Sequence, residues 1–187
     1  MTTSATEPAS RSDEDLLKAF AAGERDALGA LARRHERALL GLALGLLDRN
    51  QAMARDAVQN MWVRVIRAAA DFRGASSVKT WLYRVLINEC RTLRSNESTE
   101  ALRRARKAAA VQRSAETTES KGARTQLVLA LRALPPRDQE ILLLCHHRGL
   151  THEQAAAILG IPAGTLKTRL YAAMRQLKER LAPEVLA

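Results

Sequence analysis

The chain has 187 residues, 47% of them hydrophobic, which is enough to bury one core or two small ones. Thirty basic residues outnumber 20 acidic ones, and this net charge of +10 favours a polyanionic partner, either nucleic acid or an acidic membrane surface. Two widely spaced cysteines exclude a disulfide framework, and the polar residues 1–12 do not resemble a signal peptide. A cytoplasmic location is therefore expected.

Four helices are predicted in the first half of the chain. Ser12 suits an N-cap before three acidic residues, and Gly23 ends this first helix. Apolar residues at three-to-four spacing predict further helices over 25–47, about 51–70 and 78–94, with a loop at 71–76 between the last two. Tyr83 is expected on the polar side of the helix over 78–94. No segment alternates as a β-strand would, so the predicted fold class is all-α.

A change of composition divides the chain into segments. Residues 95–125 are polar and almost free of large apolar side chains, which indicates a flexible linker with partial helix around 101–111. Large apolar residues return at Leu127, and short helices are predicted on either side of Pro135 and Pro136. We therefore expect two small helical bundles, and the predicted segments are a disordered N-terminus (1–11), a first bundle (12–94), a linker (95–125) and a second bundle (126–187).

The second bundle contains the pattern of a helix-turn-helix. Thr151 and Gln154 have the spacing of a capping box, Gly160 suits the left-handed residue that ends a helix, and Pro162 suits the first turn of the next. In that next helix one stripe is apolar, from Leu166 to Leu181, whereas the opposite side is polar and basic. This arrangement predicts a recognition helix that lies in the major groove of DNA.

Two sets of motifs resemble the bacterial RNA polymerase sigma factors of the extracytoplasmic-function type. DAVQNMWVRV (56–65), FRG (72–74) and KTWLYRV (79–85) resemble the first conserved domain of that family. LPPR (134–137), GLT (149–151) and LGIPAGTLKTRL (159–170) resemble the second. The two sets occur in the family's order and flank a polar linker.

The resemblance implies a subunit that binds core RNA polymerase and directs promoter-specific initiation, in a response to stress or another signal. Polymerase docking would use Asp56, Gln59, Asn60 and Arg64. The −10 element would be contacted by Arg73, Ser76, Lys79, Thr80, Tyr83, Arg84, Asn88 and Arg91, and small residues of the loop at 74–77 would receive an extruded base. The −35 element would be contacted by Gly164, Thr165, Lys167, Thr168, Arg169 and Tyr171. An anti-sigma protein is a further expected partner.

Other classes of function have weaker support in the sequence. A free-standing helix-turn-helix regulator, which would bind duplex DNA without polymerase, is the main alternative, and a basic protein of membrane surfaces is a second. Phosphate loops, nucleophile elbows and paired catalytic carboxylates are absent from the sequence, so we expect neither an enzyme nor a small-molecule substrate. Cys145, His146 and His147 are adjacent on one predicted helix and do not converge on a metal, so no metal or cofactor is expected.

Overall fold

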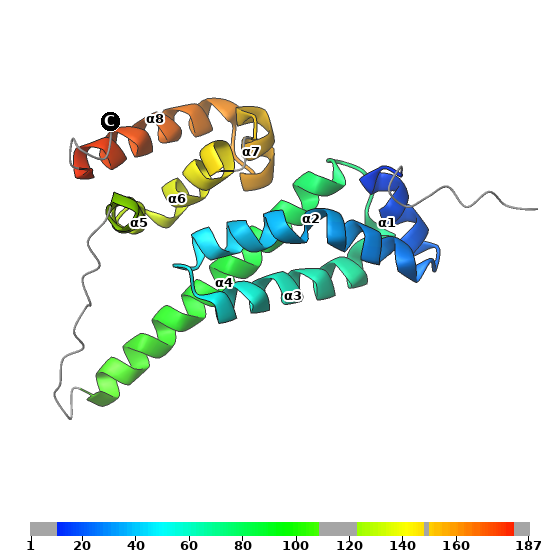
Figure 1. Ribbon diagram of the computed structural model, residues 1–187, viewed down its shortest axis with the longest axis horizontal. Helices are drawn as coiled ribbons and strands as arrows, with labels where there is room; N and C mark the ends of the chain where they lie inside the picture. Colours follow the sequence, from blue (N-terminus) through cyan, green and yellow to red (C-terminus); the bar gives the residue numbers. More distant parts are fainter. Residues whose placement is uncertain (1–10, 109–122, 148–149, 182–187) are drawn as a thin grey trace, which may run out of the picture. The chain divides into compact units, whose positions relative to one another are not determined.

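The computed structural model describes residues 11–108, 123–147 and 150–181, and the regular structure within these ranges is helical (Figure 1). The prediction of an all-α protein is confirmed. The chain divides into two compact units, residues 1–90 with 157–160 and residues 91–156 with 161–187. Among the helices in the described ranges, none combines the length and the apolar character that crossing a membrane requires.

The first unit is built from the helices predicted for the first half of the chain. They are α1 (Asp13–Ala21), α2 (Arg25–Leu46), α3 (Gln51–Ala68), the short 3-10 helix η1 (Ala69–Asp71) and α4 (Val78–Ala108), which continues into the second unit. Helix α1 packs against α2 and η1, and α2 packs against α3 (Figure 1). The apolar stripes meet in a core in which the following side chains are at most 2% exposed: Leu16, Leu17, Leu31, Leu39, Leu42, Leu46, Met61, Leu82, Leu86 and Ile87.

Helix α4 is longer than the sequence pattern predicted. The apolar stripe ends near Arg94, where we expected the helix to end, but the helix continues to Ala108. The added turns are rich in Ala, Arg and Glu, which favour helix without an apolar face to bury. Ser98 and Thr99 each donate a hydroxyl hydrogen bond to the Ser95 carbonyl, both at 2.8 Å. The rest of the predicted linker up to residue 122, and the predicted disordered residues 1–10, lie outside the described ranges.

The second unit supports the recognition helix on a small core. Its further elements are α5 (Ala123–Arg132), α6 (Pro136–Leu142), the π-helical turn η2 (Leu143–His147), α7 (His152–Leu159) and α8 (Ala163–Arg180). Helix α8 packs against α5 and α6. Its stripe of Ala173 and Leu177, together with Leu181, meets Ala130, Leu134 and Leu142. This core leaves the opposite side of α8 exposed.

Candidate nucleic-acid interface

The loop between η1 and α4 is shaped by one glycine and one aromatic pair. Gly74 has a φ of +69°, a left-handed conformation that favours glycine. The rings of Phe72 and Trp81 lie 5.0 Å apart at an interplanar angle of 41°, so the start of the loop packs against the first turn of α4. Arg73 lies between these residues in sequence and is exposed. The loop is therefore held by packing at Phe72, whereas Arg73 and Gly74 are exposed to solvent.

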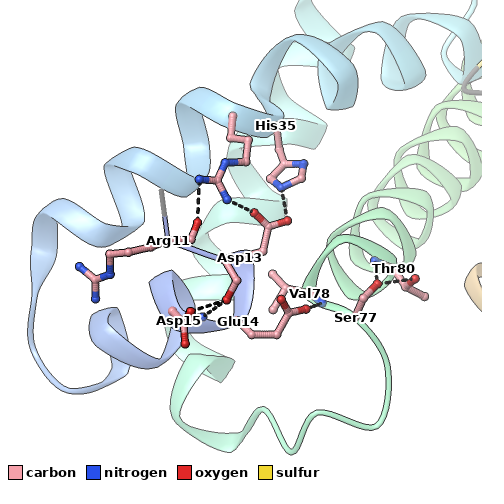
Figure 2. A network of polar contacts seen from close by, with 10 residues as sticks. Arg11, Asp13, Glu14, Asp15, His35, Ser77, Val78 and Thr80 are labelled. Carbon is pink, nitrogen blue, oxygen red and sulfur yellow. Dashed lines mark hydrogen bonds and ion pairs between the residues drawn. The ribbon is translucent and has the colours of Figure 1, made fainter. Parts of the chain in front are cut away.

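The backbone N–H groups in the first turn of α4 donate hydrogen bonds to two different acceptors, one local and one on α1. Ser77 accepts from the Thr80 N–H at 3.2 Å and donates to the Thr80 hydroxyl at 2.9 Å, as a local cap. The Val78 N–H donates instead to a carboxylate oxygen of Glu14, at 2.9 Å. Glu14 belongs to α1, 64 residues earlier in the chain. Figure 2 shows both caps at the start of α4.

Helix α1 is itself fixed by polar contacts (Figure 2). Ser12 accepts from the Asp15 N–H at 3.1 Å, and its hydroxyl donates to the Asp15 carboxylate at 2.6 Å. That hydroxyl hydrogen bond lowers the pKa of Asp15 below its ordinary value. The Asp13 carboxylate lies 2.6 Å from the Arg34 guanidinium and 2.6 Å from His35 Nε2, both on α2. Asp13 therefore ties the start of α1 to the middle of α2.

A cavity of about 490 Å³ lies between α1 and the loop. Glu14, Lys18 and Leu17 contribute one wall, and Phe72, Arg73 and Gly74 contribute the facing one. Two cations, Lys18 and Arg73, thus stand beside a space large enough for a nucleobase. The small residues of the loop had been predicted to make such a space, but the contribution of α1 was not anticipated.

The residues predicted to contact the −10 element differ in how far their side chains are exposed to solvent. Arg73, Lys79, Arg84 and Asn88 are exposed, and Ser76 is half-buried. Tyr83, predicted to lie on the polar side of the helix, is only 2% exposed, so that expectation is wrong. A large aromatic ring gains more free energy by burial than by exposure. Thr80 is 9% exposed and its hydroxyl is engaged by Ser77, so it serves the cap of α4.

Two predicted DNA-binding arginines have protein partners. Within the second unit, Arg91 makes a bidentate ion pair with Glu140, with N···O distances of 2.8 and 2.6 Å. The hydrogen bond to this carboxylate raises the pKa of Arg91 further above its ordinary value. Within the first unit, the Arg84 guanidinium donates to the Ala157 carbonyl at 2.6 Å. Both guanidinium groups therefore bind protein acceptors in the structure.

The outward face of α3 carries the predicted docking residues and an apolar addition. Asp56, Gln59 and Asn60 are all exposed, as predicted. Val63 and Ile66 continue the same face along the helix and are 40% and 47% exposed. The sequence reasoning missed these two residues, although their position off the buried stripe of α3 was a usable signal. We define these five residues as the α3 face.

Arg64, the fourth predicted docking residue, has a different role in the structure. Its guanidinium makes an ion pair with the buried carboxylate of Glu89 on α4. A buried carboxylate without a cation would be costly, so Arg64 stabilises the contact between α3 and α4. Its side chain is still 63% exposed, so part of the guanidinium remains accessible beside the α3 face.

The start of α7 has the predicted capping box and its end has the predicted glycine, whereas Pro162 lies one position earlier than predicted, before the first turn of α8. The Thr151 N–H donates to the Gln154 side-chain oxygen at 3.0 Å, and the Gln154 N–H donates to the Thr151 hydroxyl at 3.2 Å, which is a reciprocal capping box. Gly160 has a φ of +67° and ends α7. Pro162 stands one residue before α8, as its N-cap. Glu153 lies in the first turn of α7. Hydrogen bonds from the backbone N–H of Glu153 and from the Thr151 side chain lower the pKa of the Glu153 carboxyl.

The first two turns of α8 present a continuous polar surface. All six side chains or backbone positions predicted to contact the −35 element are exposed: Gly164, Thr165, Lys167, Thr168, Arg169 and Tyr171. Tyr171 is 75% exposed, which is unusual for a large aromatic residue. Leu166, in the middle of this set, is fully buried and anchors the helix. We call the six exposed positions the α8 surface.

Cys145 and the nearby histidines form no cluster in the described ranges. There, no three His, Cys, Asp or Glu side chains gather in a way that could hold a metal ion. Partial burial raises the pKa of the Cys145 thiol, which disfavours the thiolate form that metals bind.

Comparison with protein families finds two adjacent matches. Residues 31–108 match the family described as "Sigma-70 region 2", and residues 124–177 match "Sigma-70, region 4". The loop and the whole α3 face lie in the first match, and the α8 surface lies in the second. Helix α1 precedes both.

Relatives and solved structures agree with these matches. The ECF RNA polymerase sigma factor SigM of Mycobacterium tuberculosis is 32% identical over 176 residues, covering 91% of this chain and 85% of SigM. The RNA polymerase sigma-H factor of Pseudomonas aeruginosa is 26% identical over 187 residues, covering 91% of this chain and 94% of that relative. The structure of CnrH in complex with the cytosolic domain of CnrY is similar with a TM-score of 0.68 at 25% identity, covering 90% of this chain and 96% of CnrH. RpoE of Bartonella quintana, solved with the anti-sigma factor NepR, has a TM-score of 0.60 at 24% identity and covers 80% of this chain and 92% of RpoE.

Proposed function

The chain belongs to the extracytoplasmic-function sigma factors of bacterial RNA polymerase, and from this we propose a division of labour between its surfaces. The α3 face binds core polymerase, the loop at 72–77 binds the −10 element, and the α8 surface binds the −35 element. The observation that carries this proposal is that region 2 and region 4 matches occur together in one chain. A free-standing regulator needs only the second of these, so that alternative is not favoured.

The α3 face has the composition of a protein-binding surface. Val63 and Ile66 are large apolar side chains held in water, which is the usual sign of an unpartnered interface. Asp56, Gln59 and Asn60 surround them with polar groups that bind through hydrogen bonds and give specificity. This combination fits docking on a helical element of core polymerase, with the apolar pair at the centre.

The loop and its cavity fit a single-stranded −10 element. An extruded base needs a space outside the duplex, and a cavity of about 490 Å³ adjoins the loop. Lys18 and Arg73 at its walls, with Lys79 nearby in sequence, supply cations for the phosphates. Melting then needs no nucleotide hydrolysis, because binding of the extruded base offsets an unstacking cost of a few kcal/mol.

The α8 surface fits the major groove of duplex DNA. Lys167 and Arg169 supply charge to phosphates or base edges, Thr165 and Thr168 supply hydroxyls, and Tyr171 supplies an apolar edge. The Thr168 hydroxyl donates to the Gly164 carbonyl at 3.1 Å, so its oxygen keeps accepting capacity for a base donor. Gly164 allows close approach of the DNA backbone to the start of the helix.

The proposal includes the setting in which the protein acts. It works in the cytoplasm with core polymerase, catalyses no reaction of its own, and serves a response to stress or another signal. We propose an anti-sigma protein as its inhibitor. The similar RpoE of Bartonella quintana was solved in complex with such a factor.

A footprinting experiment on a library of genomic fragments tests the proposal. Protein alone, core polymerase alone and the mixture are compared by DNase protection and by permanganate reactivity of unpaired thymines. We expect protection over the −35 and −10 elements, with reactive thymines near −10, only in the mixture. Protection of a palindromic duplex site by the protein alone would contradict the proposal and favour a free-standing regulator.

A further inference from the structure

Helix α1 lies ahead of the residues that match region 2, yet it reaches the −10 loop. The match begins at residue 31, whereas α1 spans Asp13–Ala21. Its Glu14 accepts a hydrogen bond from the N–H of Val78, the residue at which α4 begins and the loop ends. The same side chain contributes to the wall of the cavity that adjoins the loop. Glu14 thus lines the cavity and also contacts the start of α4.

The contact is favourable for electrostatic reasons. The first N–H groups of a helix have no partner inside the helix and carry a partial positive charge. Ser77 caps the Thr80 N–H, and Glu14 caps the Val78 N–H from another helix. A charged acceptor makes a stronger hydrogen bond than a neutral one. Glu14 therefore determines where the first turn of α4, and with it the end of the loop, is held.

Glu14 is presented by a rigid support. Leu16 and Leu17, next to it on α1, are 0% and 2% exposed in the core of the first unit. Asp13 joins α1 to Arg34 and His35 of α2, with contacts of 2.6 Å each. Figure 2 shows the contact between Asp13 and His35. Arg34 also donates to the Arg11 carbonyl at 2.9 Å. The loop, by contrast, contains Gly74 with a positive φ and no buried apolar side chain between 73 and 77. The position of the loop is thus imposed from α1.

We propose that Glu14 is a positioning residue for promoter opening: its carboxylate holds the end of the 72–77 loop and the start of α4 in the arrangement that receives an unstacked base of the −10 strand. This inference rests on the proposed function of the loop. Glu14 acts through the loop and the helix terminus, and its negative charge makes it a poor direct contact for DNA. Helix α1 becomes part of the promoter-reading apparatus, ahead of the matched region.

The test measures binding of holoenzyme to a single-stranded probe. The probe is the fluorescently labelled non-template strand of the −10 element from the genomic promoter that gives the strongest permanganate signal. A second set of probes replaces each base in turn by an abasic residue. The variants are Glu14→Ala and Glu14→Gln, and the matched control is Glu36→Ala, which removes the same charge from an exposed position on α2. Binding to core polymerase and thermal unfolding are measured for every variant.

We expect Glu14→Ala to weaken binding of the intact strand about tenfold, the scale of one charge-assisted hydrogen bond. The probe that lacks the extruded base should bind the wild type and Glu14→Ala with equal affinity. Without that base, the position of the loop no longer contributes to the binding free energy. Glu14→Gln keeps an acceptor oxygen and should recover part of the loss. Glu36→Ala should match the wild type, and core binding should stay within about twofold for all variants.

Two results would overturn the inference. Equal weakening of the intact and all abasic probes by Glu14→Ala would mean that the residue only maintains the fold, and unchanged binding of the intact probe would mean that it positions nothing. If the proposed function of the loop is itself wrong, the result differs from both of these. Wild-type holoenzyme would then bind the intact strand no better than the abasic probes.

Discussion

Removing two cations from the α8 surface should weaken −35 binding by an amount that depends on salt. Lys167 and Arg169 are exposed in the first two turns of α8, and the double variant Lys167→Ala with Arg169→Ala leaves the buried Leu166, which directly precedes Lys167, untouched. If each cation neutralises one phosphate, each contributes a slope of about −0.9 to the plot of log affinity against log salt. Losing both reduces the slope by about 1.8 units.

The predicted slope gives a measurable ratio. When the salt concentration rises from 50 to 200 mM, the wild type should lose affinity by a factor about twelve times larger than the factor for the double variant. Fluorescence anisotropy of holoenzyme on a duplex −35 probe measures both curves. The control is Arg180→Ala, a cation in the last turn of α8 that lies about 20 Å further along the helix axis than Lys167. Parallel salt curves for the double variant and the wild type would refute the assignment of these cations to DNA, and so would a matching loss of core binding.

Three further predictions concern docking, stability and pH. Changing Val63 and Ile66 together to Asp should lower affinity for core polymerase about tenfold or more, since charges replace the apolar centre of the α3 face, while circular dichroism stays unchanged; unchanged affinity would exclude this face. Leu166→Ala should cost about 2–5 kcal/mol of unfolding free energy in urea titrations, whereas exposed Thr165→Ala should cost less than about 0.5 kcal/mol; equal costs would contradict the burial of Leu166. The pKa of Glu153 is lower in the folded protein than in the unfolded chain, so the ionised carboxylate stabilises the fold above the unfolded pKa, and this stabilisation is lost as pH falls through the folded pKa. Glu153→Gln should therefore make the unfolding free energy depend less steeply on pH in the acid range. An unaltered pH dependence would contradict this.

Local chemistry made the helix ends predictable from the sequence. The N-cap at Ser12, the capping box of Thr151 and Gln154, and the left-handed Gly160 depend on residues within a few positions of each other. The exposed α8 surface followed from the same periodicity that buries Leu166. These features are set by short-range contacts, which a sequence pattern records directly.

Contacts between distant segments were not predictable in this way. Nothing in the sequence pairs Glu14 with Val78, because their meeting depends on how α1 packs in the first unit. Tyr83 was expected on a polar face, and its burial is a tertiary effect that periodicity along one helix does not record. Partial helix was expected around 101–111, but not the unbroken continuation of α4 from Arg94 to Ala108. Apolar periodicity detects buried faces, whereas residues 95–108 form helix through backbone bonds and favourable propensity.

The measurement that tests the central claim most directly is run-off transcription with purified core polymerase on the fragments protected in the footprint. The account predicts defined transcripts, starting downstream of the protected −10 element, only when this protein is added to core. It also predicts that they are lost when Asp56 and Gln59 are both changed to Ala, because that variant no longer docks. Absence of any promoter-specific transcript with a core preparation that is active with another sigma factor would contradict the account.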